Sequence, residues 1–243
     1  MRAATSEGRR PFVCRPKVMR HVKTVAVILL GLLAGTAAAL WFSGRGPFRK
    51  PPPAEAPADL SKAAPGAEPP RARGGSAPGA VTLEEFADFQ CPPCGRLHPE
   101  LKKIEGEYGE RLRVVFRHLP LGSIHDHALE AALAAEAAGA QGKFWEMRDL
   151  LYERQGEWSV VEPARPVFVG YARQLGLDAE RFERDVDAPE TRARVETDVN
   201  RADTAHVQAT PTLFLEGREL SAPERTPGGL RAAIDAALKG QRP

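Results

Sequence analysis

Cysteine is scarce in this sequence of 243 residues, which has only three of them. A small scaffold held together by disulfides would need more. Neither sign of charge is in excess, because the formal net charge is only +2, so nothing indicates a nucleic-acid partner. Two of the three cysteines, Cys91 and Cys94, lie in one Cys-Pro-Pro-Cys motif. This pairing points to chemistry and not to scaffolding.

Long apolar runs are also rare, and the clearest one is residues 25–42, VAVILLGLLAGTAAALWF. About 18 apolar residues, rising roughly 1.5 Å each, nearly cross a hydrocarbon core of about 30 Å. Residues 1–24 are basic, which by the positive-inside rule keeps them in the cytoplasm and exports the rest. We therefore predict a single-pass signal-anchor in a bacterial cell membrane, with the remainder on the periplasmic side.

Two alternatives at this end stay open. The segment 37–39 (Ala-Ala-Ala) could serve as the cleavage site of a signal peptide, which would remove the anchor. Translation could also start at Met19, and Cys14 would then be absent from the protein. If Cys14 is present, we interpret it as a reduced spectator on the cytoplasmic side.

Residues 43–79 are dominated by proline, alanine, glycine and charged residues. Such a composition cannot bury enough apolar area to offset its ordering entropy. We predict a disordered, partly extended linker here, which would tether the following domain to the membrane.

Residues 80–243 have the patterns of one α/β domain. Residues 81–89 and 111–119 are rich in strand formers, and apolar residues at helical spacing follow Cys94. This order predicts a strand–helix–strand unit with parallel strands. Helical patterns then occupy an insertion of about 122–204, at 127–140, 144–154, 167–175, 179–186 and 188–204. A hairpin of 212–215 and 219–220 and a helix over 228–238 close the domain.

The Cys-Pro-Pro-Cys motif lies where a strand ends and a helix begins. A helix N-terminus has unpaired N–H groups and a partial positive charge, which stabilise a thiolate at Cys91. Pro92 and Pro93 are tolerated there because first-turn residues need no intrahelical N–H bond, and they stiffen the loop. Cys94 would resolve a mixed disulfide by attacking Cys91.

The runs EEFADFQCPPC, RVVFRHLPL, QGKFWEMRDLLYERQ and ATPTLFLEGREL together resemble the DsbA-like branch of the thioredoxin superfamily. The resemblance implies a thioredoxin fold with an inserted helical domain and an enzyme that exchanges disulfides with proteins. It implies that Cys91 is the nucleophile and Cys94 the resolving thiol. Pro211 would be the cis-proline facing the disulfide, and Thr210 would offer backbone groups to an extended substrate.

Together with Thr210 and Pro211, we expect Pro92 and Pro93 to form the substrate-binding surface. Strong oxidases of this family usually have a histidine where Pro93 stands, so the direction of electron flow is open, with oxidation favoured. Exported substrate proteins and a membrane redox partner are the expected partners, and nucleic acid is not.

Glu85 lies six residues before Cys91, where the family often has an acidic residue beneath the active site. A buried carboxylate there has a raised pKa and could shuttle the proton of Cys94. The alternative is a surface carboxylate on a strand edge. Asp88 is closer to the motif, and we interpret it as a residue that caps or solvates the loop.

The remaining candidates are interpreted as structural. We expect His98 at a solvated helix position and exposed histidines at 125 and 127, while Trp158 could line a substrate groove or be partly buried. No metal ligand set is expected, and no cofactor other than the redox-active cysteine pair. Two other functions remain open: a soft-metal (copper or zinc) delivery protein that uses the cysteine pair, and a domain with an inert disulfide.

Overall fold

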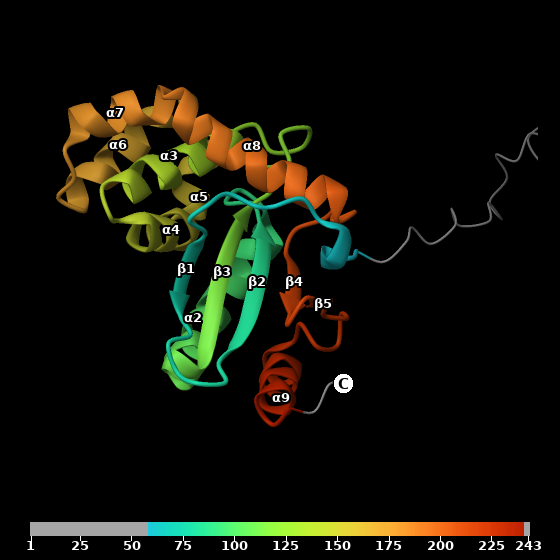
Figure 1. Ribbon diagram of the computed structural model, residues 1–243. Helices are drawn as coiled ribbons and strands as arrows, with labels where there is room; N and C mark the ends of the chain where they lie inside the picture. The colour runs from blue at the N-terminus through green and yellow to red at the C-terminus, as the bar shows by residue number, and fades with distance from the viewer. Residues whose placement is uncertain (1–57, 241–243) are drawn as a thin grey trace, which may run out of the picture. The chain divides into compact units, whose positions relative to one another are not determined.

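A five-stranded sheet forms the centre of the domain in the computed structural model, which describes residues 58–240 (Figure 1). The spatial order is β1-β3-β2-β4-β5. β2 and β3 are parallel, and the other neighbouring pairs are antiparallel. The strands are β1 (Arg71–Gly74), β2 (Val81–Ala87), β3 (Leu112–His118), β4 (Thr212–Leu215) and β5 (Arg218–Glu219).

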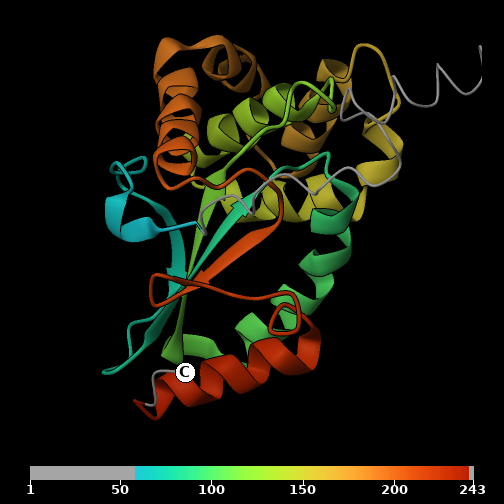
Figure 2. The same cartoon turned by 90° about the vertical axis from the view of Figure 1, so that its right-hand side faces the viewer.

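The predicted strand–helix–strand unit is confirmed: α2 (Pro92–Tyr108) connects β2 to its parallel neighbour β3. Side chains along β2 alternate between the two faces of the sheet. Leu83 packs with apolar residues of α2 and of α9 (Pro227–Leu238), whereas Phe86 packs on the opposite face with Phe214. Figure 2 shows α2 running along the sheet from the helical block toward α9.

The predicted helical insertion between β3 and β4 is also confirmed, with bounds within two residues of those expected. It lies at the end of the sheet where β2 and β3 finish (Figure 1). Its central helix is rich in alanine, and the small side chains are almost all buried against the neighbouring helices. The helices are α3 (Ala128–Ala140), α4 (Phe144–Glu153), α5 (Gln155–Trp158), α6 (Arg165–Gln174), α7 (Ala179–Asp187) and α8 (Pro189–Thr204).

The prediction of a disordered linker is wrong for residues 58–79, which belong to the folded domain. They contain the short 3-10 helix η1 (Leu60–Lys62) and the edge strand β1. β1 is held by its backbone pairing with β3 and by its arginines. Arg71 donates to buried Glu136 at 3.1 Å, and the Arg73 guanidinium lies 4.3 Å from the centre of the Trp145 ring. Composition does not reveal such a strand, because backbone pairing and ion pairs stabilise it instead of apolar side chains.

The predicted cytoplasmic segment 1–24, the predicted membrane segment 25–42 and the first part of the predicted linker, 43–57, lie outside the described residues. Within 58–240, none of the helices has both the length and the apolar character that a membrane span requires.

Candidate active site

The Cys-Pro-Pro-Cys motif forms the N-terminus of α2, as the sequence predicts. Cys91 is the N-cap residue, with extended backbone angles, and Pro92 and Pro93 occupy the first turn. The Gly95 N–H donates to the Cys91 carbonyl at 3.1 Å and so closes this turn. Both cysteines are free thiols; Cys94 is fully buried and Cys91 is 5% exposed. Cys91 is thus the cysteine that a reactant reaches first.

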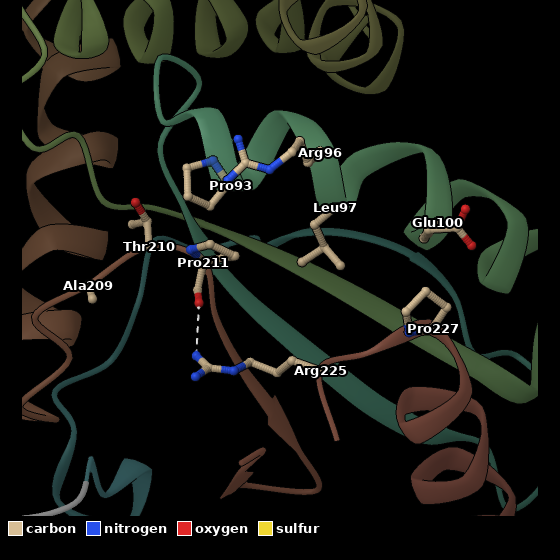
Figure 3. Close-up of a pocket in the computed structure, with 9 residues that line it drawn as sticks. All are labelled: Pro93, Arg96, Leu97, Glu100, Ala209, Thr210, Pro211, Arg225 and Pro227. Atoms are coloured by element: carbon tan, nitrogen blue, oxygen red, sulfur yellow. Dashed lines mark hydrogen bonds between the residues drawn. The ribbon is translucent and has the colours of Figure 1, made fainter. Parts of the chain in front are cut away.

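The loop before β4 brings Thr210 and Pro211 to the redox motif. The Thr210–Pro211 peptide bond is cis, as the family resemblance implies. In its protonated form the Cys91 thiol donates to the Thr210 carbonyl over 3.3 Å, although the two residues are far apart in sequence. Figure 3 shows Thr210 and Pro211 facing Pro93 of α2. Of the four residues predicted to bind substrate, Pro93, Thr210 and Pro211 line one groove, and Pro92 directly follows Cys91 outside that lining.

The two thiols have very different acidities. The pKa of Cys91 is lowered to about 6, mainly by a hydrogen bond from the Cys94 thiol and also by the Thr210 side chain. Burial and the charge of Asp88 act against this shift. Burial raises the pKa of Cys94 far above its ordinary value, and the nearby Cys91 and Glu85 raise it further. At neutral pH the thiolate therefore resides on Cys91 and the proton on Cys94.

Glu85 is buried beneath the motif and is not a surface carboxylate on a strand edge. Its side chain is 1% exposed, and its Oε2 accepts from Nη2 of fully buried Arg148 at 3.2 Å. Burial raises the pKa of Glu85, and Arg148 partly opposes this rise. Arg148 also reaches Glu105 on α2 at 3.4 Å, so it joins β2, α2 and α4. Glu85 is therefore a buried carboxyl group whose ionised form has one direct cationic partner, Arg148.

His98 lies one turn after Cys94 and is buried, so the prediction of a solvated helix position is wrong. Its ring centre lies 5.0 Å from that of Tyr152, whose hydroxyl has no hydrogen-bond partner in the described structure. Burial lowers the pKa of His98 to about 3, which makes the ring neutral at neutral pH. Burial, more than any nearby charge, raises the pKa of Tyr152 well above its ordinary value. A small cluster of buried polar groups therefore lies beneath Cys94.

One group of side chains in the described range is spaced closely enough to hold a cation: His98, Asp149 and Glu153. The Lys102 ammonium already lies 2.9 Å from both carboxylates and supplies the positive charge there. Neither redox cysteine belongs to this group.

Asp88 is buried and organises the loop before the motif. It accepts from the N–H groups of Gln90 at 2.7 Å and Leu121 at 2.9 Å, and it contacts His125 Nδ1 at 2.7 Å. The prediction of exposed histidines is therefore wrong: His125 is mostly covered and His127 is buried. These bonds fix the loop that positions Cys91, in agreement with the interpretation of Asp88 as a loop cap.

The helical block supplies residues that sequence reasoning missed. Gln155 donates to the carbonyls of Phe89 at 2.6 Å and Cys91 at 3.0 Å, and these bonds hold the motif against α5.

Trp158, which the sequence offers as a possible groove residue, is fully buried and donates to the Leu151 carbonyl, so it lines no groove. One signal was visible for Arg148, because it follows Phe144 by four residues and therefore lies on the apolar face of its helix.

Comparisons with known proteins agree with this geometry. A family model described as thioredoxin matches residues 69–236. The chain belongs to this thioredoxin family. Its similarity to solved structures confirms the predicted thioredoxin fold with a helical insertion, and the DsbA-like branch and the enzyme class, a protein thiol–disulfide oxidoreductase, stay predictions.

Two solved structures illustrate the similarity. Oxidised BdbD from Bacillus subtilis has a TM-score of 0.62 and 21% identity, covering 74% of this chain and 100% of that one. A thioredoxin-like oxidoreductase from Silicibacter pomeroyi has a TM-score of 0.56 and 27% identity, covering 70% of this chain and 92% of that one.

Relatives in sequence include a protein named Na(+)/H(+) antiporter NhaA 1 from Salinispora arenicola, 41% identical over 162 residues. That match covers 67% of this chain and 24% of the relative. The chain therefore spans about a quarter of the length of the curated relatives that it matches.

Proposed function

We propose that this DsbA-like protein exchanges disulfides with exported proteins through Cys91 and Cys94, with oxidation of the substrate as the favoured direction. The observation that supports this most is the difference in acidity and burial between the two thiols. Cys91, the less deeply buried of the two, has a pKa of about 6 beside a cis-proline loop, and fully buried Cys94 retains its proton. A cysteine of lowered pKa is a good leaving group, and this favours transfer of the disulfide to the substrate.

The oxidising cycle begins with a Cys91–Cys94 disulfide. A substrate thiolate attacks Cys91 Sγ, which forms a mixed disulfide and releases Cys94 as a thiolate. Cys94 then takes up a proton, because its raised pKa disfavours the charged form. A second substrate thiolate attacks the substrate sulfur and expels the Cys91 thiolate. Two electrons have then passed from the substrate to the cysteine pair, and a membrane partner that accepts them would restore the disulfide.

Glu85 is proposed to handle the proton of Cys94. It is buried near that thiol, its raised pKa brings it closer to neutrality, and Arg148 keeps its ionised form tolerable. A group with these properties can donate a proton when Cys94 is released and accept it when Cys94 attacks in the reverse direction. Thr210 and Pro211, with Pro92 and Pro93, are proposed to contact the substrate segment.

The proposed location follows from the sequence. Residues 25–42 would anchor the protein in a bacterial cell membrane, and the catalytic domain would face the periplasmic side. Sodium transport is not part of the proposal, because the match to the antiporters covers about a quarter of their length.

A redox titration tests the proposal. The protein is equilibrated in glutathione buffers of graded potential, and the Cys91–Cys94 disulfide is followed by thiol trapping. A potential well above the thioredoxin value of about −270 mV supports an oxidase, whereas a thioredoxin-like value supports a reductase or isomerase. A pair that forms no reversible disulfide would overturn the proposal, and titration of the reduced protein with copper or zinc would then test the soft-metal alternative.

A further inference from the structure

A groove beside the redox motif contains two arginines that form no ion pair with any carboxylate of residues 58–240. The groove has a volume of about 490 Å³, and its charged lining residues are Arg96, Glu100 and Arg225. The other lining residues are mostly apolar and include Pro93 and the cis-proline Pro211. Figure 3 shows Arg96 extending from α2 and Arg225 from the segment before α9, with Pro211 between them in this view.

Neither arginine of the groove is paired with a neighbouring acidic side chain of residues 58–240. Arg96 is exposed and forms no ion pair within residues 58–240. Glu100, the one acidic residue of the groove, lies 2.7 Å from the Lys103 ammonium. Glu224 precedes Arg225 in the chain but binds Arg218 at 2.7 Å instead. The groove therefore presents a net positive charge to whatever enters it.

Arg225 has a further property that suits a binding role. Its Nη1 donates to the Pro211 carbonyl at 3.2 Å, which ties it to the loop that touches Cys91 (Figure 3). A guanidinium has five N–H donors, so most of them remain available to a ligand. A carboxylate carries the opposite charge, and its two oxygens match the paired N–H donors of a guanidinium group, so it suits a site between two arginines.

We propose that the groove selects substrate segments in which an acidic side chain lies close in sequence to the reacting cysteine, because Pro93 and Thr210 line the groove and also flank Cys91. The carboxylate would lie between Arg96 and Arg225, and the apolar lining would cover the flanking residues. This inference rests on the proposed disulfide exchange and names the substrates that the exchange prefers. Complementary charge of this kind raises the association rate and sets the register of the segment.

The test measures how fast short peptides with a single cysteine reduce the Cys91–Cys94 disulfide of the full chain. Three peptides differ only at the residue next to cysteine, which is Glu, Gln or Lys. At low salt the wild type should react about 5- to 10-fold faster with the Glu peptide than with the Gln peptide, and the Lys peptide should be slowest. The preference should shrink in 1 M salt, where charges are screened.

Variants locate the origin of the preference. Arg96→Gln combined with Arg225→Gln should bring the Glu-to-Gln rate ratio near one, and Arg96→Glu with Arg225→Glu should favour the Lys peptide. Arg184→Gln is the matched control, because Arg184 is an exposed arginine of the helical block and should keep the wild-type ratio. Comparing two peptides on each variant removes any general effect of the substitution on the fold.

The outcomes separate this inference from the proposed function. If the wild type is reduced by neither the peptides nor dithiothreitol, the disulfide exchange itself is refuted. If it reacts with all three peptides at the same rate, the exchange stands and the acidic preference is refuted. A preference that survives in the double glutamine variant would also overturn the assignment to these arginines.

Discussion

Ionisation of Cys91 should make the reduced protein more stable as the pH rises. The folded-state pKa is about 6, whereas the ordinary value is 9.0. A depressed pKa contributes stability that is complete above the unfolded pKa and is lost as the pH falls through the folded pKa. Between these two pKa values the contribution grows by a little over 1 kcal/mol for each pH unit, and it vanishes near pH 5.

Urea unfolding of the reduced protein from pH 5 to pH 8 measures this term. Subtracting the free energy of unfolding of Cys91→Ser cancels the other ionisable groups, so the remaining difference reports on Cys91. The difference should grow with pH as calculated above. A difference that stays constant across this range would show that Cys91 has an ordinary pKa and would refute the reasoning.

A second variant tests the cause of the shift. Cys94→Ala retains Cys91 but removes the thiol that contributes most to lowering its pKa. The pH dependence of this variant should move to higher pH. The rate of Cys91 alkylation as a function of pH gives the same pKa directly, and it should show an inflection near 6 in the wild type only.

Three further predictions concern the buried charges. Glu85→Gln should slow the attack of Cys94 on a mixed disulfide by about 10²-fold and remove a pH inflection, as measured in single turnovers; an unchanged rate would exclude a proton-transfer role. Arg148→Met should lower the free energy of unfolding by about 3–5 kcal/mol, because Glu85 loses its partner in the interior. Adding Glu85→Gln to Arg148→Met should recover part of that loss, and strictly additive effects would contradict direct pairing. Hydrogen bonds from His118 and Arg71 hold the pKa of Glu136 well below its ordinary 4.5 despite burial, so stability should fall as the pH drops below about 4.5. Glu136→Gln should lack this acid-dependent loss in urea unfolding at pH 7 and pH 3.

The assembly of the redox site depends on contacts between segments that are far apart in the chain. Cys91 contacts the Thr210 carbonyl, and Glu85 on β2 accepts a hydrogen bond from Arg148 on α4. The sequence motif identifies the two cysteines, but the partners that set their acidity come from the helical block and the cis-proline loop. The family resemblance predicts the cis-proline at Pro211. For Arg148 the sequence indicates only that it lies on the apolar face of α4.

Errors in the sequence-based predictions share a physical origin. His98 and Trp158 are assigned from their local surroundings, yet His98 is buried where α2 packs against Tyr152, and Trp158 is buried within the helical block against Phe168. Strand β1 was overlooked because its stability comes from pairing with β3 and from the salt bridge of Arg71 to Glu136, neither of which leaves an apolar pattern.

Local sequence patterns were enough to predict the α/β order, the helical insertion and the position of the redox motif at the start of a helix. These features follow from local periodicity and from the conformational preferences of proline, which act over a few residues. The tertiary structure decided which polar groups are buried beside Cys94 and which arginines remain unpaired in the groove. Those properties depend on long-range packing, because burial and charge pairing are set by whichever distant segments the fold brings into contact.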